Sequence, residues 1–167
     1  MVSSIIAIAT ISTSSVSVTV HWILKGHLMT DTKDYGPAPY VVDIEKDTLD
    51  NPNFRTTRWT GKNIQLTLMT ILVGGDIGLE VHETHDQFLR LEQGTGRVQM
   101  GPTKDQLSFE REVRADWAVF VPAGTWHNIT NIGDEPIKLY AIYAPPDHLH
   151  GTVHATQGDA KNDPNEH

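Results

Sequence analysis

Two short segments of this chain hold the residues whose types and spacing could do chemistry. The first is Glu80-Val81-His82 with Gln87 shortly after it, and the second is a Pro-x-Gly turn followed by His127. One carboxylate and two imidazoles with open positions suit non-haem ferrous iron, and this set also binds manganese, nickel or zinc. The sequence therefore predicts one divalent metal (Fe, Mn, Ni or Zn) bound by Glu80, His82 and His127. Gln87 is then a weak fourth ligand, or a neighbour that orients the substrate.

The alternation of side chains along β-strands predicts that these residues share one interior. Glu80 and His82 point to the same face of an extended run. On the next run Arg90 lies on the opposite parity and prefers solvent, which places Gln87 on the inner face. The Pro-x-Gly turn reverses the chain, so that His127 begins a new strand. A barrel whose mouth gathers these strands would bring all four side chains to one centre, where a carboxylate offsets part of the metal charge.

Two further residues are candidates for catalysis beside this centre. His85 is the nearest spare histidine and could act as a general base or as a ligand at the rim. It follows His82 by three residues, a spacing that shares a face on a helix but not on a strand, so we expect it on a loop. Tyr143 has the same parity as Leu139 and could supply a hydroxyl at the mouth of the barrel.

Length, composition and charge restrict the class of protein. A chain of 167 residues forms one domain and can bury a core without disulfides. It has no cysteine, which excludes thiolate metal sites and fits a reducing compartment, so we expect a cytoplasmic protein. The net charge of −8 argues against a nucleic-acid partner. No apolar run approaches the roughly 20 residues that cross a bilayer, so we expect no membrane partner.

Composition divides the chain into four parts. Residues 1–28 contain no acidic residue, and three interpretations remain: an extension upstream of a working start at Met29, an added edge strand, or a poor export signal. We favour the first. Residues 29–62 are expected to form an N-terminal arm with strands, residues 63–146 the barrel, and residues 147–167 a His-rich tail. That tail is polar from Ala155 onwards and is expected to be loose.

Short β-like runs separated by turn residues fill the middle of the chain, and no segment shows a sustained helical period. This pattern is typical of a sandwich, jelly roll or barrel. The predicted strands are Asn63–Val73, Ile77–His82, Gln87–Glu92, Arg97–Gly101, Leu107–Val113, Trp117–Val121, Trp126–Ile132 and Ile137–Ala144. The first has apolar residues on both faces, which predicts that both are covered and suggests a dimer interface.

The same region resembles the two motifs of the cupin superfamily, over roughly half of the chain. Its first motif matches Gly74, Glu80, His82, Gln87 and Gly94, with glutamate in place of the first histidine and glutamine in place of the usual glutamate. The second motif matches Asp116, Pro122, Gly124, His127 and Asn131, with Asp116 where a glycine is usual. The resemblance implies an all-β, single-domain double-stranded β-helix (jelly roll) that frequently forms homodimers. The carboxylate thus stands at the position of the first histidine, and three strong metal ligands remain, Glu80, His82 and His127.

The resemblance implies a range of activities on small molecules. Small single-domain cupins are often likened to mannose-6-phosphate isomerase, so we expect a metal-dependent sugar or sugar-phosphate isomerase. The ligand types fit a non-haem Fe(II) dioxygenase equally well, and a cupin that binds a ligand without turnover is the third possibility. A phosphosugar would need a cationic clamp. Its candidates are Arg55, Arg58, Lys62 and Arg97, although each is more readily explained as a solvated surface charge.

A second cluster of histidines lies in the C-terminal part, at His148, His150 and His154. Metal binding by these three is one possibility. An exposed terminal loop explains them more simply, and such a loop could fold over the mouth of the barrel as a lid.

Overall fold

The computed structural model describes residues 7–8, 21–22 and 31–166 of the chain. The predicted extension over residues 1–28 therefore lies almost entirely outside the described residues. Its two described pieces, β1 (Ala7–Ile8) and β2 (His21–Trp22), pair with each other in antiparallel fashion.

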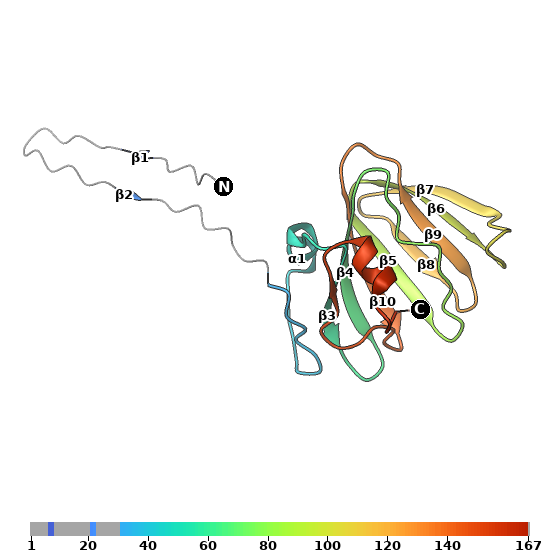
Figure 1. The fold of residues 1–167 in the computed structure, drawn as a ribbon, viewed down its shortest axis with the longest axis horizontal. Helices are drawn as coiled ribbons and strands as arrows, with labels where there is room; N and C mark the ends of the chain where they lie inside the picture. Colours follow the sequence, from blue (N-terminus) through green and yellow to red (C-terminus); the bar gives the residue numbers. More distant parts are fainter. Residues whose placement is uncertain (1–6, 9–20, 23–30, 167) are drawn as a thin grey trace, which may run out of the picture.

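Two antiparallel sheets form most of the described residues 31–166 (Figure 1). The larger sheet has the strand order β11-β3-β4-β10-β5-β8, and the smaller has the order β7-β6-β9. The strands are β3 (Arg55–Thr60), β4 (Gln65–Ile71), β5 (Asp86–Gln93), β6 (Thr95–Gly101), β7 (Phe109–Arg114), β8 (Ala118–Val121), β9 (Trp126–Asn131), β10 (Ile137–Ala144) and β11 (Val153–His154). The predicted all-β jelly roll is confirmed.

The core lies between the two sheets. Leu89 and Leu91 of β5 and Leu139 of β10 are fully buried against Val98 and Ile129 of the smaller sheet. Burying each such side chain contributes roughly 1.5–3 kcal/mol. On β5 buried and less buried residues alternate from Gln87 onwards, as the sequence predicts, so Gln87 shares the inner face with the core leucines.

The prediction of a regular strand over Ile77–His82 is wrong. Only two isolated bridges form here, Asp76 with Thr130 and Glu80 with His127. Between them Gly78 has a φ of +96°, and the Asp76 carboxylate accepts its N–H at 3.0 Å. This side-chain turn competes with regular pairing, so the segment touches β9 at single points rather than along a ladder.

Two short helices lie in segments where no helix was predicted. In α1 (Ile44–Asp50) Asp43 accepts the N–H of Lys46, and in α2 (Gln157–Asn162) Thr156 and Asp159 form a capping box. Helices of six or seven residues are too short to show a helical period, and the caps were their only signal. No described helix has the length and hydropathy that a bilayer crossing requires.

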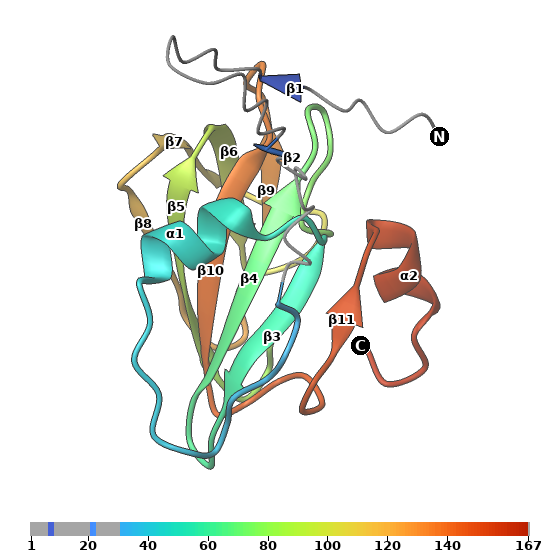
Figure 2. The ribbon, with the colours of Figure 1, turned by 90° about the vertical axis from the view of Figure 1, so that its left-hand side faces the viewer.

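Helix α1 covers the outer face of the larger sheet (Figure 2), where it contacts β10, β5 and β4. At its end the Thr70 hydroxyl of β4 donates to the Asn51 carbonyl at 2.6 Å. Residues on both faces of β4 are buried, as predicted, including Leu68 on one face and Met69 on the other. Because α1 supplies cover within the same chain, this burial does not by itself require a second copy, and the homodimer stays a prediction.

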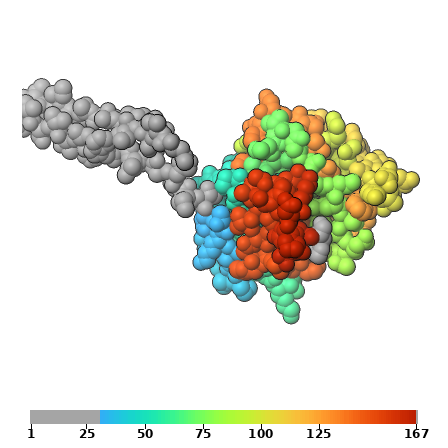
Figure 3. All heavy atoms as spheres, viewed as in Figure 1, coloured from blue at the N-terminus to red at the C-terminus, as the bar shows by residue number. Residues whose placement is uncertain are grey.

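The C-terminal part is folded, so the expectation of a loose, exposed tail is wrong. Strand β11 pairs with β3, and α2 follows it. His148 and His154 are buried, and only His150 has a largely exposed side chain. Figure 3 shows this segment in red, spread over the middle of the face in view. Pairing with β3, which short-range sequence patterns do not reveal, is what orders it.

The two motif glycines at the ends of the first motif differ in what surrounds them, and this gives a prediction. Both have positive φ, +75° at Gly74 and +88° at Gly94. A Cβ at Gly94 would lie 2.9 Å from the Ile137 backbone, whereas nothing lies within 4 Å of one at Gly74. We expect Gly94→Ala to lower the free energy of unfolding by about 2–4 kcal/mol and Gly74→Ala by only about 1–2 kcal/mol. Urea unfolding followed by circular dichroism measures both, and equal losses would contradict the packing argument.

Candidate metal centre

A backbone bridge between the two motifs brings Glu80 opposite His127. The Glu80 N–H donates to the His127 carbonyl at 3.1 Å, and the His127 N–H donates to the Glu80 carbonyl at 2.9 Å. Residues that exchange both hydrogen bonds lie directly opposite each other and project their side chains to the same face. The Glu80 Oε1 atom consequently lies 3.3 Å from His127 Nε2.

His82 joins this pair from the same segment as Glu80. Its Nε2 atom lies 3.4 Å from Glu80 Oε1, and the ligand atoms of Glu80, His82 and His127 all lie within 4.8 Å of one another. Ligands at roughly 2.0–2.2 Å from one tetrahedral ion are separated by about 3.3–3.6 Å. The three side chains thus converge with the spacing that a common ion requires.

The orientation of His127 turns its outer nitrogen toward Glu80. Its Nδ1 atom lies 3.0 Å from the Thr125 carbonyl, which can only accept, so Nδ1 is the donor there and Nε2 is the atom that faces the Glu80 carboxylate. The turn is itself anchored, because the Gly124 N–H donates to the His82 carbonyl at 2.8 Å. The Asp86 carboxylate also accepts the Ala123 N–H at 2.9 Å. The turn therefore holds both histidine-bearing segments together.

Burial and the two imidazoles act in opposite directions on Glu80. Burial would raise the pKa of its carboxyl, but His127 and His82 beside it, with the more distant charge of Arg55, hold that pKa well below its usual range. Burial likewise opposes a charge on His82, but the Glu80 carboxylate outweighs it and raises the His82 pKa. The Glu80 carboxylate and the His82 imidazole therefore each favour the charged form of the other.

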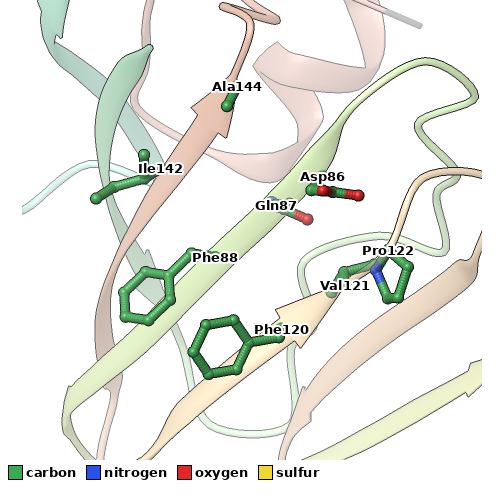
Figure 4. A pocket seen from close by; sticks show the side chains of 8 residues that line it. All are labelled: Asp86, Gln87, Phe88, Phe120, Val121, Pro122, Ile142 and Ala144. Atoms are coloured by element: carbon green, nitrogen blue, oxygen red, sulfur yellow. The ribbon is translucent and has the colours of Figure 1, made fainter.

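Gln87 and Tyr143 line the same interior. They are direct neighbours on β5 and β10, and both are almost completely buried. Neither the Gln87 amide nor the Tyr143 hydroxyl has a hydrogen-bond partner among the described residues. Burial raises the pKa of Tyr143 far above its usual value, although Arg55 opposes the shift, so its hydroxyl keeps its proton. The outer face of β5 and β8 carries Phe88 and Phe120 instead (Figure 4).

A second group of possible ligands shares His82 with the first. Asp147 Oδ1 lies 3.3 Å from His85 Nε2 and 3.6 Å from His82 Nδ1. The rings of His82 and His85 stack with centroids 4.6 Å apart. His85 is on a loop, as predicted, and the two rings stack although strand parity would separate them. The reason is that residues 81–85 form no regular strand, so strand parity does not apply to them.

Two of the four predicted surface cations are buried instead. Arg58 is 1% exposed and contacts Asp47 of α1, with Nε 2.7 Å from Oδ2. Arg55 is 4% exposed and pairs with Glu166. The other two, Lys62 and Arg97, are exposed as expected.

Glu166, almost at the end of the chain, lies beside the centre. Besides Arg55, its carboxylate contacts the Nδ1 atom of His148 at 3.0 Å. Burial would raise the pKa of Glu166, but His148 and Arg55 hold it below its ordinary value. Sequence reasoning missed Glu166 and Asp147. Asp147 had one weak signal, since the two prolines that end β10 place the next residue at the mouth where that strand stops.

The other motif residues support the frame around the centre. Asp116, which stands where the cupin motif usually has glycine, has a φ of +70° and accepts a hydrogen bond from Arg90 at 2.7 Å. Asn131 donates to the carbonyls of Ile71 and Glu135 at 3.0 and 2.9 Å. These contacts close the loops that flank the two motifs.

The residues present fit a divalent metal. The Nε2 atoms of His82 and His127 and the Gln87 Oε1 atom are buried, and none has a hydrogen-bond partner among the described residues. Buried polar atoms without partners are costly in a protein interior. One carboxylate and two imidazoles form a donor set that compensates this cost when a cation binds.

The comparisons with known proteins agree with the motifs. The family model described as Cupin domain matches residues 67–143. An uncharacterised Bacillus subtilis protein, YrkC, is 59% identical over 128 residues, which is 77% of this chain and 69% of the relative. An uncharacterised protein of Acanthamoeba polyphaga mimivirus, L612, is 37% identical over 68% of this chain and 70% of its own length.

A solved structure is similar along nearly its whole length. The crystal structure of a Bacillus halodurans protein is 56% identical, has a TM-score of 0.78, and aligns over 78% of this chain and 99% of that chain. A putative sugar phosphate isomerase from Acidithiobacillus ferrooxidans shares only the fold, at 13% identity and a TM-score of 0.50, over 65% of this chain and 76% of that one.

Removing a ligand should empty the centre. Elemental analysis of protein purified without an affinity tag should find about one divalent metal per chain, and Glu80→Ala or His127→Ala should weaken binding by more than about 100-fold. Gln87→Ala should weaken it by about tenfold or less, and the exposed His150→Ala is the control. Equal metal content in the wild-type protein, Glu80→Ala and His127→Ala would contradict the assignment.

The pKa of His82 should govern metal affinity as the pH changes. In the metal-free protein an NMR titration should place it above the ordinary 6.5, and Glu80→Gln should lower it by removing the carboxylate. Its raised pKa stabilises the metal-free fold below about pH 6.5, and this contribution is lost as the pH rises through the folded-state value. Metal binding has the opposite pH dependence, because the metal needs the unprotonated His82 ring. Metal affinity should therefore weaken about tenfold per pH unit below that pKa. An affinity that is constant from pH 8 to pH 5.5 would rule out this competition.

Proposed function

This chain belongs to the cupin family, and we propose that it is a metal-dependent enzyme that moves a proton on an oxygenated small molecule. Sugars and sugar phosphates are the substrate class that we favour, and the reaction is then an isomerisation. The observation that carries this proposal is the pair formed by His85 and Asp147, 3.3 Å apart, beside the three candidate ligands.

Glu80, His82 and His127 would hold the metal, with Gln87 as the fourth group. When bound, a divalent metal supplies Lewis-acid polarisation of a substrate oxygen, and ferrous iron in addition supplies open positions for dioxygen. The protein itself must then supply a base, since Glu80 is occupied as a ligand.

His85 is our candidate for that base. Burial lowers the pKa of His85, so its imidazole is neutral at pH 7 and can accept a proton. Asp147 lies where it can orient the ring and stabilise the imidazolium that forms, as a carboxylate does for a general-base histidine. Tyr143 keeps its proton, and its hydroxyl can donate a hydrogen bond to a substrate oxygen that gains negative charge.

The ligand set favours a second candidate function. Two histidines and one carboxylate are the donors of non-haem Fe(II) oxygenases. That chemistry needs no general base, so it does not explain the pairing of His85 with Asp147. A cupin that binds a small ligand without turnover would use neither feature.

One experiment separates these candidates. The protein loaded with Mn²⁺, Fe²⁺ or Zn²⁺ is incubated without oxygen in D₂O with a panel of sugars and sugar phosphates, and deuterium incorporation is followed by NMR. We expect exchange at the carbon beside the carbonyl, and a loss of about 100-fold or more in His85→Gln because general-base catalysis contributes about 10²–10⁴-fold.

His150→Gln, which changes an exposed histidine, is the matched control and should keep full exchange. Metal content is measured in each variant, so that a loss of the base is not confused with a loss of metal. Oxygen consumption on diketones without any exchange would favour the dioxygenase. If neither reaction occurs and one compound binds tightly, the non-catalytic binding cupin is the candidate that remains.

A further inference from the structure

The end of the chain closes the candidate metal centre. Glu166 pairs with Arg55 of β3 and contacts His148 Nδ1 at 3.0 Å. A small cavity remains beside the centre, and Asn165 and Glu166 of this segment line it together with Glu80, Val81, His82, Asp147 and His148. The tail is therefore one wall of the space next to the proposed ligands.

That cavity is too small for any sugar or organic acid. Its volume is about 20 Å³, which is enough for about one water molecule. Figure 3 shows the C-terminal segment spread over one face of the molecule. A substrate that approaches by this route must displace Asn165 and Glu166.

Displacement of Glu166 would uncover a site that requires an anion. Arg55 is 4% exposed, and a buried guanidinium without a carboxylate partner is strongly unfavourable. The Arg55 Nε and His148 Nε2 atoms are buried without a hydrogen-bond partner among the described residues. Arg55 thus keeps an unused donor while Glu166 is bound to it, and its guanidinium offers a fork that suits a bidentate oxyanion.

We propose that Arg55 and His148 form the subsite for an oxyanion of the substrate, a carboxylate or a phosphate, and that Glu166 occupies this subsite in the free protein. The proposal rests on the proposed function, because it makes the substrate an anion whose remaining atoms reach Glu80, His82 and His127. The Glu166 carboxylate then competes with the substrate for this subsite, and the acid group of the substrate replaces it when the substrate binds.

The test measures anion binding when the competitor is removed. Malonate and inorganic phosphate are titrated calorimetrically into the wild-type chain and into Glu166→Gln, each with and without Mn²⁺. Glu166→Gln should bind one of the two anions at least about tenfold more tightly than the wild type, because the free subsite is no longer a minor state. Which of the two gains affinity distinguishes a carboxylate from a phosphate substrate.

Two further variants control for charge and for the subsite itself. Glu110→Gln removes one exposed acid from β7 and makes the same change in net charge, so it should leave anion affinity unchanged. Arg55→Gln combined with Glu166→Gln keeps two neutral groups that can still hydrogen-bond, and should lose the gain. No gain in Glu166→Gln, or an equal gain in the double variant, would overturn the proposal.

Metal titration of the same proteins separates this proposal from the proposed function. If the protein binds metal normally but Glu166→Gln shows no gain in anion affinity, only the subsite proposal is overturned. A gain that depends on Arg55 in a protein that binds no metal supports the subsite and overturns only the metal-dependent function.

Discussion

The exchange of two backbone hydrogen bonds between Glu80 and His127 is the constraint on which the candidate centre depends. It is an isolated bridge rather than part of a ladder, and together with the second bridge, between Asp76 and Thr130, it sets the position of the first motif against the second. Because the partners of such a bridge project to one face, the carboxylate meets the imidazole without any further adjustment. His82 follows because the same short segment is tied to the Pro-x-Gly turn through its carbonyl.

Around that bridge carboxylates alternate with basic side chains. Glu80 faces His82 and His127, Asp147 faces His85 and His82, and Glu166 faces Arg55 and His148. A buried charge is tolerated only with a partner, so each of these groups constrains the next. This arrangement connects β3, the loop after Ile71, the end of β10 and the C-terminal segment, which lie far apart in the sequence.

Strand parity predicted the inner face of β5 well, since Leu89 and Leu91 alternate there with more exposed residues. It failed between His82 and His85, where residues 81–85 form no regular strand and the two rings stack. Periodicity also could not reveal α1 and α2, because each has fewer than two full turns. The folded tail was missed for a different reason: β11 is ordered by pairing with β3, about a hundred residues earlier.

From the order of its residues alone, the chain determined its all-β class, the two cupin motifs and the identity of Glu80, His82 and His127 as one converging set. These features follow from local rules, namely turn residues, side-chain alternation and fixed spacings. Only the tertiary structure decided that Asp147 lies beside His85, that Arg55 is buried and that Glu166 reaches it. Such contacts join segments whose local sequence does not favour a particular secondary structure. They stabilise the fold only after charged groups that are distant in the sequence have been brought together out of water.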